Sequence, residues 1–104
     1  MNGNRESLKF FKKIVKKMIL LKNGVFRGYL KINTVSGIMV SYLRMNYLEE
    51  KLPKEKFVRI HKSYIISTEH IQAISSTYIR INNYEIPIGR FYKARLDEIL
   101  RKTN

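Results

Sequence analysis

The stretch FVRIHKSYII, residues 57–66, combines the two properties around which the rest of this chain is organised. Its β-branched and aromatic side chains fit a pleated, half-buried surface, which predicts extended structure. Between them stand Arg59, His61, Lys62 and Ser63, which carry several hydrogen-bond donors close together. We therefore expect one side of the stretch to pack in a core and the other side to meet a polyanion.

Composition predicts one small domain with an anionic partner. The 104 residues are enough for a single core of modest size. Twenty-one Lys and Arg residues stand against eight Asp and Glu, giving a formal charge of +13 that favours nucleic acid, anionic lipid or an acidic protein. Apolar residues make up 44% of the chain, which excludes compositional disorder. The absence of cysteine excludes disulfides and thiolate sites and is compatible with a cytoplasmic protein.

The basic N-terminal segment, residues 1–27, contains pairs of apolar residues that alternate with pairs of lysines. Read locally, this period predicts an amphipathic helix within residues 8–21, with its apolar side chains docked on the domain and its lysines in solvent. A membrane-surface helix or a self-association face is the alternative use of the same pattern. The longest apolar run, residues 18–21, is far shorter than the ~20 residues that cross a membrane.

Two hairpins are expected further along the chain. Residues 29–34 and 38–42 look like strands joined by a tight turn. Residues 78–81 and 84–88 flank Asn82-Asn83, and asparagine tolerates the positive φ that a two-residue hairpin loop requires.

Two short helices are predicted, near residues 44–51 and 90–101. Met45, Leu48 and Leu52 recur at helical spacing, and Pro53 ends the first helix. The second helix begins after Gly89, which offers no side-chain acceptor as an N-cap.

Four separated motifs, in this order along the chain, resemble the LytTR family of DNA-binding domains. The resemblance extends from about Gly28 to Leu96, roughly two thirds of the sequence. The residues that carry it are Tyr29–Ile32, Leu48–Pro53, the set Phe57, Arg59, His61, Ser63 and Tyr64, then Ile71, and finally Ile86–Lys93.

The resemblance implies a mainly β fold for residues 28–104, with small antiparallel sheets packed around one core, a short central helix and a C-terminal helix. It implies strands where residues 8–21 have a helical period, so helix and strand both stay open for that segment. The implied function is sequence-specific binding of double-stranded DNA by the output domain of a bacterial transcriptional regulator. Two copies are expected on each repeated site, as a possible homodimer on DNA, and no receiver domain is expected in this chain.

The family's base-contacting positions correspond to Arg90, to Lys62 and, more loosely, to Tyr29. The resemblance places these residues on loops that follow strands, and not on one recognition helix. A guanidinium at Arg90 can hold guanine through two hydrogen bonds. Two plainer roles stay open: Arg90 covers the last helix or pairs with Asp97, and Lys62 is an ordinary solvated lysine.

Six further side chains are candidates for contacts with phosphate, which supply affinity independent of sequence. Arg59 alternates with apolar positions, so that phosphate contact and a salt bridge are equally compatible with its place. His61 is expected to be structural, with one ring nitrogen satisfying a backbone group. The phosphate candidates are Arg27, Lys31, Arg59, Ser63, Tyr92 and Lys93.

Neither a metal or cofactor site nor a catalytic site is expected. His61 and His70 are nine positions apart with only Glu69 nearby, which does not match the usual ligand spacings. The acids are spread thinly, and no nucleophile has a matching base. Two rival functions remain: an RNA- or ribosome-binding basic protein whose aromatic side chains stack on unpaired bases, and a membrane- or partner-binding module that uses residues 8–21.

Overall fold

Eight antiparallel strands form the framework of the chain that the computed structural model describes, which is residues 9, 12–24 and 28–102. The mainly β fold expected from the sequence is confirmed. The strands are β1 (Met18–Asn23), β2 (Leu30–Thr34), β3 (Gly37–Ser41), β4 (Phe57–His61), β5 (Tyr64–Ser67), β6 (Ile71–Ile74), β7 (Tyr78–Ile81) and β8 (Tyr84–Pro87). After a helical turn at residues 12–15, the helical elements are α2 (Met45–Lys51), the 3-10 turns η1 (Thr68–His70) and η2 (Arg90–Tyr92), and α3 (Lys93–Lys102).

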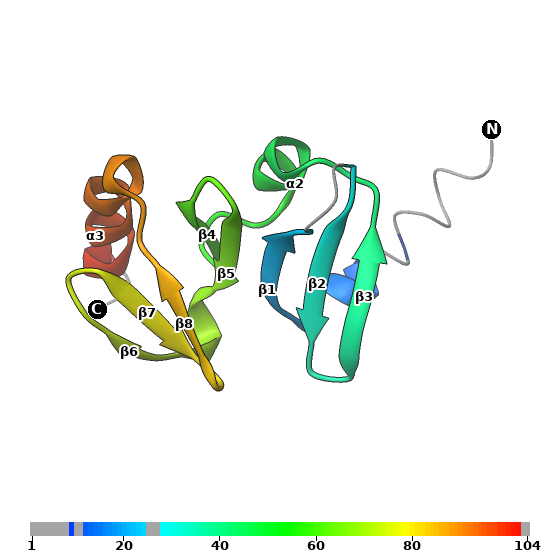
Figure 1. The fold of residues 1–104 in the computed structure, drawn as a ribbon, viewed down its shortest axis with the longest axis horizontal. Helices are drawn as coiled ribbons and strands as arrows, with labels where there is room; N and C mark the ends of the chain where they lie inside the picture. The colour runs from blue at the N-terminus through cyan, green and yellow to red at the C-terminus, as the bar shows by residue number, and fades with distance from the viewer. Residues whose placement is uncertain (1–8, 10–11, 25–27, 103–104) are drawn as a thin grey trace.

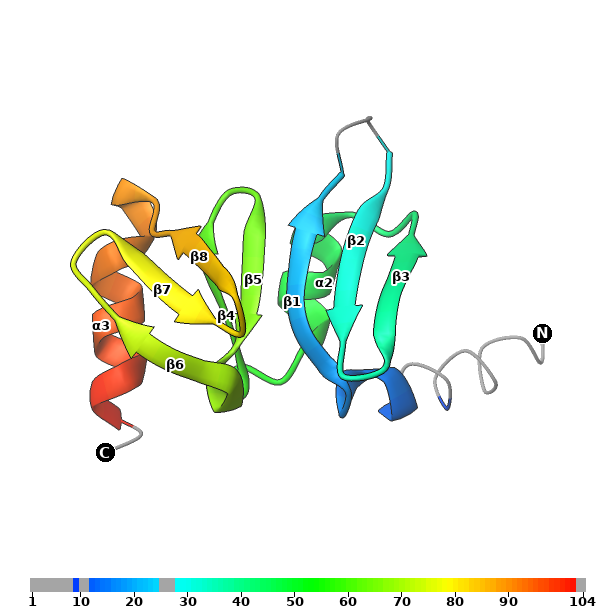
Figure 2. The same cartoon turned by 60° about the horizontal axis from the view of Figure 1, so that its bottom comes forward.

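The strands form two sheets, which lie side by side in Figure 1. The larger sheet has the order β3-β2-β1-β5-β4, and the smaller sheet has the order β6-β7-β8. Helix α2 packs against the larger sheet, and α3 packs beside the smaller one (Figures 1 and 2).

The basic N-terminal segment supplies both structures that the sequence left open. Residues 12–15 are helical, and β1 follows as the central strand of the larger sheet. The expected boundary after residue 27 falls between β1 and β2, which pair with each other from Met18–Thr34 to Asn23–Leu30. The segment is therefore a structural part of the larger sheet.

Where the structure describes the helical turn, its apolar side chains dock on the domain and its lysines face solvent, as predicted. Ile14 and Val15 pack against a buried cluster. The apolar pair Phe10 and Phe11 lies outside the described residues. The lysines of this segment are exposed, and they are Lys12, Lys13, Lys16 and Lys17. Among the described residues, no helix has both the length and the apolar character that crossing a membrane requires.

The buried side chains divide into two clusters, one on each face of the larger sheet, where the sequence predicted one core. Successive side chains on a strand point to opposite faces, so Leu21 enters the first cluster and Leu20 enters the second. The first cluster lies under α2 and comprises Met18, Leu21, Leu30, Ile32, Met45, Leu48, Leu52, Phe57 and Ile65. The second lies against the smaller sheet and α3 and comprises Ile19, Leu20, Val58, Ile60, Ile66, Ile79, Ile81, Ile86 and Leu96.

The stretch 57–66 is a hairpin and not one continuous strand. Strands β4 and β5 are joined by a turn at Lys62 and Ser63, and the register shifts between Arg59 and His61. The two other expected hairpins form as β2–β3 and β7–β8. Asn82 adopts a φ of 51° in the second of these, the conformation for which its asparagine pair was singled out.

Strand β3 forms an outer edge of the larger sheet and presents apolar side chains to solvent. Ile38 is 63% exposed, and Val40 on the same face is also exposed. The strand contains no charged residue and no proline, the two devices that most often protect a sheet edge.

Ile66→Ala should lower the free energy of unfolding by about 2–5 kcal/mol, because Ile66 is fully buried in the second cluster and the truncation leaves a cavity. Ile38→Ala, in the same sheet but exposed, is the matched control and should cost much less. Urea denaturation followed by far-ultraviolet circular dichroism measures both. Equal losses for the two variants would contradict the assigned core.

Candidate nucleic-acid interface

Three connections between elements lie along one edge of the molecule, at the top of Figure 2: the end of β1, the β4–β5 turn and the passage from β8 into η2. Backbone hydrogen bonds tie these three places together. The amide of Asn23 donates to the carbonyl oxygen of Ser63 at 3.1 Å, and the amide of Gly89 donates to the carbonyl oxygen of Ile60 at 2.7 Å. This edge is therefore a continuous surface whose parts hold fixed positions relative to one another.

Lys62 and Arg90 both lie on this edge with exposed side chains. Lys62 is in the β4–β5 turn, and Arg90 is the first residue of η2. Within the described part of the chain, neither cationic group has a hydrogen bond or an ion pair, so Arg90 does not pair with Asp97. The structure thus brings together two of the three residues expected to contact bases.

Tyr29, the third expected base contact, lies just before β2 and is half-buried. Its carbonyl oxygen accepts a hydrogen bond from the amide of Gly24 at 3.1 Å, and its ring occupies the space where a side chain on Gly24 would stand. The ring thus packs across the foot of the β1–β2 connection. Arg27, in the same connection, lies outside the described residues.

The remaining phosphate candidates differ in exposure. Lys31 on β2 and Lys93 at the start of α3 are exposed, whereas Ser63 and Tyr92 are half-buried. The amide of Ser63 donates to Nδ1 of His61 at 3.1 Å, which confirms the structural role predicted for that histidine.

Arg59 directs its guanidinium into the protein, and its side chain is only 10% exposed. Nε donates to the carbonyl oxygen of His61 at 3.3 Å, and Nη2 donates to the carbonyl oxygen of Lys62 at 2.6 Å. Nη1 donates to the side-chain oxygen of Asn46 and to Oε1 of Glu49, the latter at 2.9 Å. The guanidinium thus grips the backbone of the turn that carries Lys62 and links it to α2.

The same guanidinium also contacts the segment that carries Arg90. Its Cζ atom lies 5.8 Å from the ring centre of Tyr92, within the range of a cation–π interaction. Glu49 extends the network by accepting a hydrogen bond on Oε2 from Arg95 of α3 at 3.3 Å. One ionic cluster therefore joins α2, the β4–β5 turn, η2 and α3.

Sequence reasoning missed Asn46, Glu49 and Arg95 as parts of this site. Asn46 and Glu49 are three positions apart in a helix whose apolar stripe is Met45, Leu48 and Leu52, so they share a separate face. That spacing indicates a common polar face, but only the fold shows that Arg59 lies opposite it.

Comparison with known proteins identifies the family. The family model described as the LytTr DNA-binding domain matches residues 9–101, nearly the whole chain. The chain belongs to the LytTR family of DNA-binding domains. The matched region begins well before Gly28, so this LytTR domain includes the helical turn and β1.

Curated relatives are bacterial signalling and regulatory proteins. The domain is 33% identical over 84 residues to the sensory transduction protein LytT of Bacillus anthracis, a match that covers 75% of this chain and 34% of that protein. It is 29% identical over 85 residues to the transcriptional regulatory protein LytR of Staphylococcus aureus, covering 76% of this chain and 35% of that protein. The chain thus matches only about a third of the length of these relatives.

A solved structure shares the fold. The LytTr DNA-binding domain of a methyl-accepting/DNA response regulator from Bacillus cereus superposes with a TM-score of 0.73 at 24% identity, covering 83% of both chains. The two-sheet arrangement of this LytTR domain is therefore that of its family.

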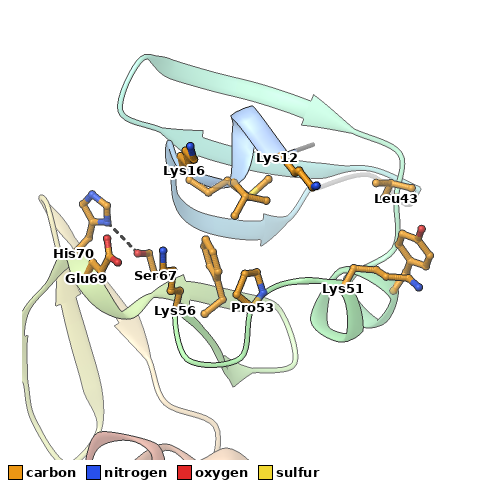
Figure 3. Close-up of a pocket in the computed structure, with 13 residues that line it drawn as sticks. Lys12, Lys16, Leu43, Lys51, Pro53, Lys56, Ser67, Glu69 and His70 are labelled. Carbon is orange, nitrogen blue, oxygen red and sulfur yellow. Dashed lines mark hydrogen bonds between the residues drawn. The ribbon is translucent and has the colours of Figure 1, made fainter. Parts of the chain in front are cut away.

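A groove of about 1210 Å³ lies beside the N-terminal helical turn of the LytTR domain (Figure 3). Residues 12–18 form one wall, and the segment from Lys51 to Phe57 forms the other. Strand β5 separates the groove from the β4–β5 turn, because it begins with Tyr64 at the turn and ends with Ser67 at the groove. The groove takes no part in the edge that carries Lys62 and Arg90.

Glu49→Gln should lower the free energy of unfolding by about 1–2 kcal/mol, since it removes a charge that is 24% exposed and holds both Arg59 and Arg95. Glu85→Gln is the matched control, because Glu85 pairs with Arg80 in solvent and should contribute little. Thermal unfolding of both variants checks the difference. A larger loss for Glu85→Gln would contradict a structural role for the Glu49 cluster.

Proposed function

We propose that this LytTR domain recognises a specific sequence in double-stranded DNA as the output domain of a bacterial transcriptional regulator. The observation that carries the proposal is the placement of Lys62 and Arg90 on one edge, linked through the hydrogen bond between Gly89 and Ile60. Two unpaired cations at fixed separation supply the donors that base reading requires. A net charge of +13 supplies attraction to phosphate at any sequence.

The resemblance to the family assigns the residues that contact bases, and exposure ranks the candidates for phosphate contacts. Arg90 reads guanine through its guanidinium, and Lys62 contacts a base edge in the same groove. Tyr29 supports the neighbouring connection and reaches a base edge from there. The phosphate contacts come from Lys31 and Lys93, with Ser63, Tyr92 and Arg27 as further members of the same set.

The whole regulator is expected to bind a repeated site in the cytoplasm with two copies of this domain, as a homodimer on DNA. Bending of the duplex between the copies would bring more phosphates to the basic surface, which offsets the cost of deformation. No cofactor and no catalytic step is part of this function.

Arg90→Ala should weaken binding to the preferred duplex by about 1–3 kcal/mol while changing binding to a scrambled duplex much less, because it removes one base contact. The preferred duplex is obtained by selecting bound sequences from a random pool with the unaltered protein. Lys12→Ala is the control. Lys12 lines the groove and Arg90 does not, so this substitution should weaken binding to both duplexes alike. Equal losses on both duplexes for Arg90→Ala would show that Arg90 touches only phosphate.

The RNA-binding rival is tested with the same protein at matched salt. Single-stranded RNA competes with the selected duplex for the labelled protein. Preference for the RNA would overturn the proposal.

Arg59 acts in this function by positioning the reading residues, in place of the phosphate contact considered for it. Its donors are occupied by two turn carbonyls and by α2, so the guanidinium holds the Lys62 turn while its face rests on Tyr92 next to Arg90. Base reading needs donors held to within about half an ångström of the productive geometry. A lysine keeps the charge but lacks the planar fork that makes these bonds together.

Arg59→Lys should therefore lower discrimination between the preferred and scrambled duplexes by roughly tenfold, with little change in binding to the scrambled duplex. Fluorescence anisotropy at several salt concentrations measures both affinities, and circular dichroism verifies the fold. In the Lys62→Ala background the same substitution should have a smaller effect. If Arg59→Lys discriminates between the duplexes as well as the unaltered protein does, Arg59 contributes only a positive charge, which lysine also supplies.

A further inference from the structure

Phe91 is the most exposed large apolar side chain in the described part of the chain, at 91%. Most of the other exposed apolar side chains lie at residues 35–47, from the β2–β3 turn to α2. Phe91 instead stands on the edge that carries Arg90 and Lys62. A phenyl ring that stays in water adds no burial energy to the fold.

The geometry of η2 explains why the ring points outward. A 3-10 turn has three residues per turn, so the side chains of Arg90, Phe91 and Tyr92 point in three directions about 120° apart. Tyr92 takes the inward direction, where its ring faces the Arg59 guanidinium. Arg90 and Phe91 are therefore left with the two outward directions, and both are exposed.

The cationic residues around Phe91 favour nucleic acid over an apolar protein surface as its partner. Arg90 precedes it, Lys93 follows two positions later, and Lys62 lies on the adjoining turn. An apolar patch on another protein would therefore have to bury these cations. DNA offers apolar and anionic groups side by side. In the major groove the only apolar group on a base edge is the C5-methyl group of thymine.

We propose that Phe91 contacts a thymine C5-methyl group next to the guanine that Arg90 reads, and so adds a second element to the recognised sequence. The inference rests on the proposed function. The two side chains start from Cα atoms about 3.8 Å apart and then diverge, so we place the thymine beside the guanine or one further step of ~3.4 Å away. The contact also distinguishes DNA from RNA, because uracil lacks this methyl group.

The test replaces single thymines by uracil, which removes the methyl group and leaves base pairing intact. The duplex is the one selected by the unaltered protein, and the relevant guanine is the one at which Arg90→Ala loses preference. Uracil next to that guanine should weaken binding roughly fourfold, the loss expected for one buried methyl group. Uracil at a thymine remote from the guanine should have no effect.

Phe91→Ala should bind the thymine and uracil duplexes equally and should retain its preference for the guanine. Phe91→Leu keeps an apolar contact and should restore part of the thymine preference. Tyr84→Ala is the matched control, because Tyr84 is an exposed aromatic residue at the far end of β8 and should leave the preference unchanged. The exposure of Phe91 means that its truncation should not alter thermal stability.

Three results would overturn the inference. The selected duplex has no thymine within two steps of the guanine; the unaltered protein ignores the uracil substitution; or Phe91→Ala remains as sensitive to uracil as the unaltered protein. A loss of DNA bending in Phe91→Ala without methyl sensitivity would identify the ring as a wedge between base pairs instead. Failure of the unaltered protein to select any sequence would refute the proposed function itself, which is a separate outcome.

Discussion

The larger sheet buries apolar side chains on both of its faces, so both faces must be covered. The rest of the fold depends on this constraint. At β1, β4 and β5 one face is covered by α2 and the other by the smaller sheet with α3. These strands consequently carry apolar residues at consecutive positions, such as Leu20 and Leu21, where a one-sided sheet would alternate apolar with polar. A slip by one residue would exchange the two sets of buried side chains, so the register is fixed by packing.

A fixed register also fixes where the strands end. Lys62 and Arg90 both lie just beyond strand ends. The Gly89–Ile60 and Asn23–Ser63 hydrogen bonds extend the sheet's order into the connections beyond it. The buried guanidinium of Arg59 then adds a side-chain link between a turn and a 3-10 segment that belong to different parts of the chain. The proposed base reading uses these rigid connections, and not the recognition helix that many other DNA-binding folds place in the groove.

The sequence predicted local features well because their causes are local. The Asn82-Asn83 turn, the helix around Leu48 and the Gly89 N-cap each follow from residues within one or two turns of the chain. The resemblance supplied the mainly β class with small antiparallel sheets. The family model and the solved structure confirm it, while the roles of Arg90, Lys62 and Tyr29 stay predictions.

What the sequence did not predict depends on contacts between distant residues. The division into two clusters, the hairpin within residues 57–66 and the orientation of Arg59 each require knowing which elements lie opposite one another. The alternating lysine and apolar pairs of the N-terminal segment are a further case. The described backbone is helical at residues 12–15. From Met18 onward, pairing with β2 and β5 imposes extended structure on the same sequence pattern.

The uncovered outer strand has a consequence for handling this protein. Among the described residues no strand pairs with the outer side of β3, and nothing in its own sequence discourages a neighbouring molecule from adding to it. What keeps molecules apart is mutual repulsion between highly cationic particles. Concentrated salt, or a polyanion added without regard to stoichiometry, screens that repulsion and makes this strand the place where precipitation begins.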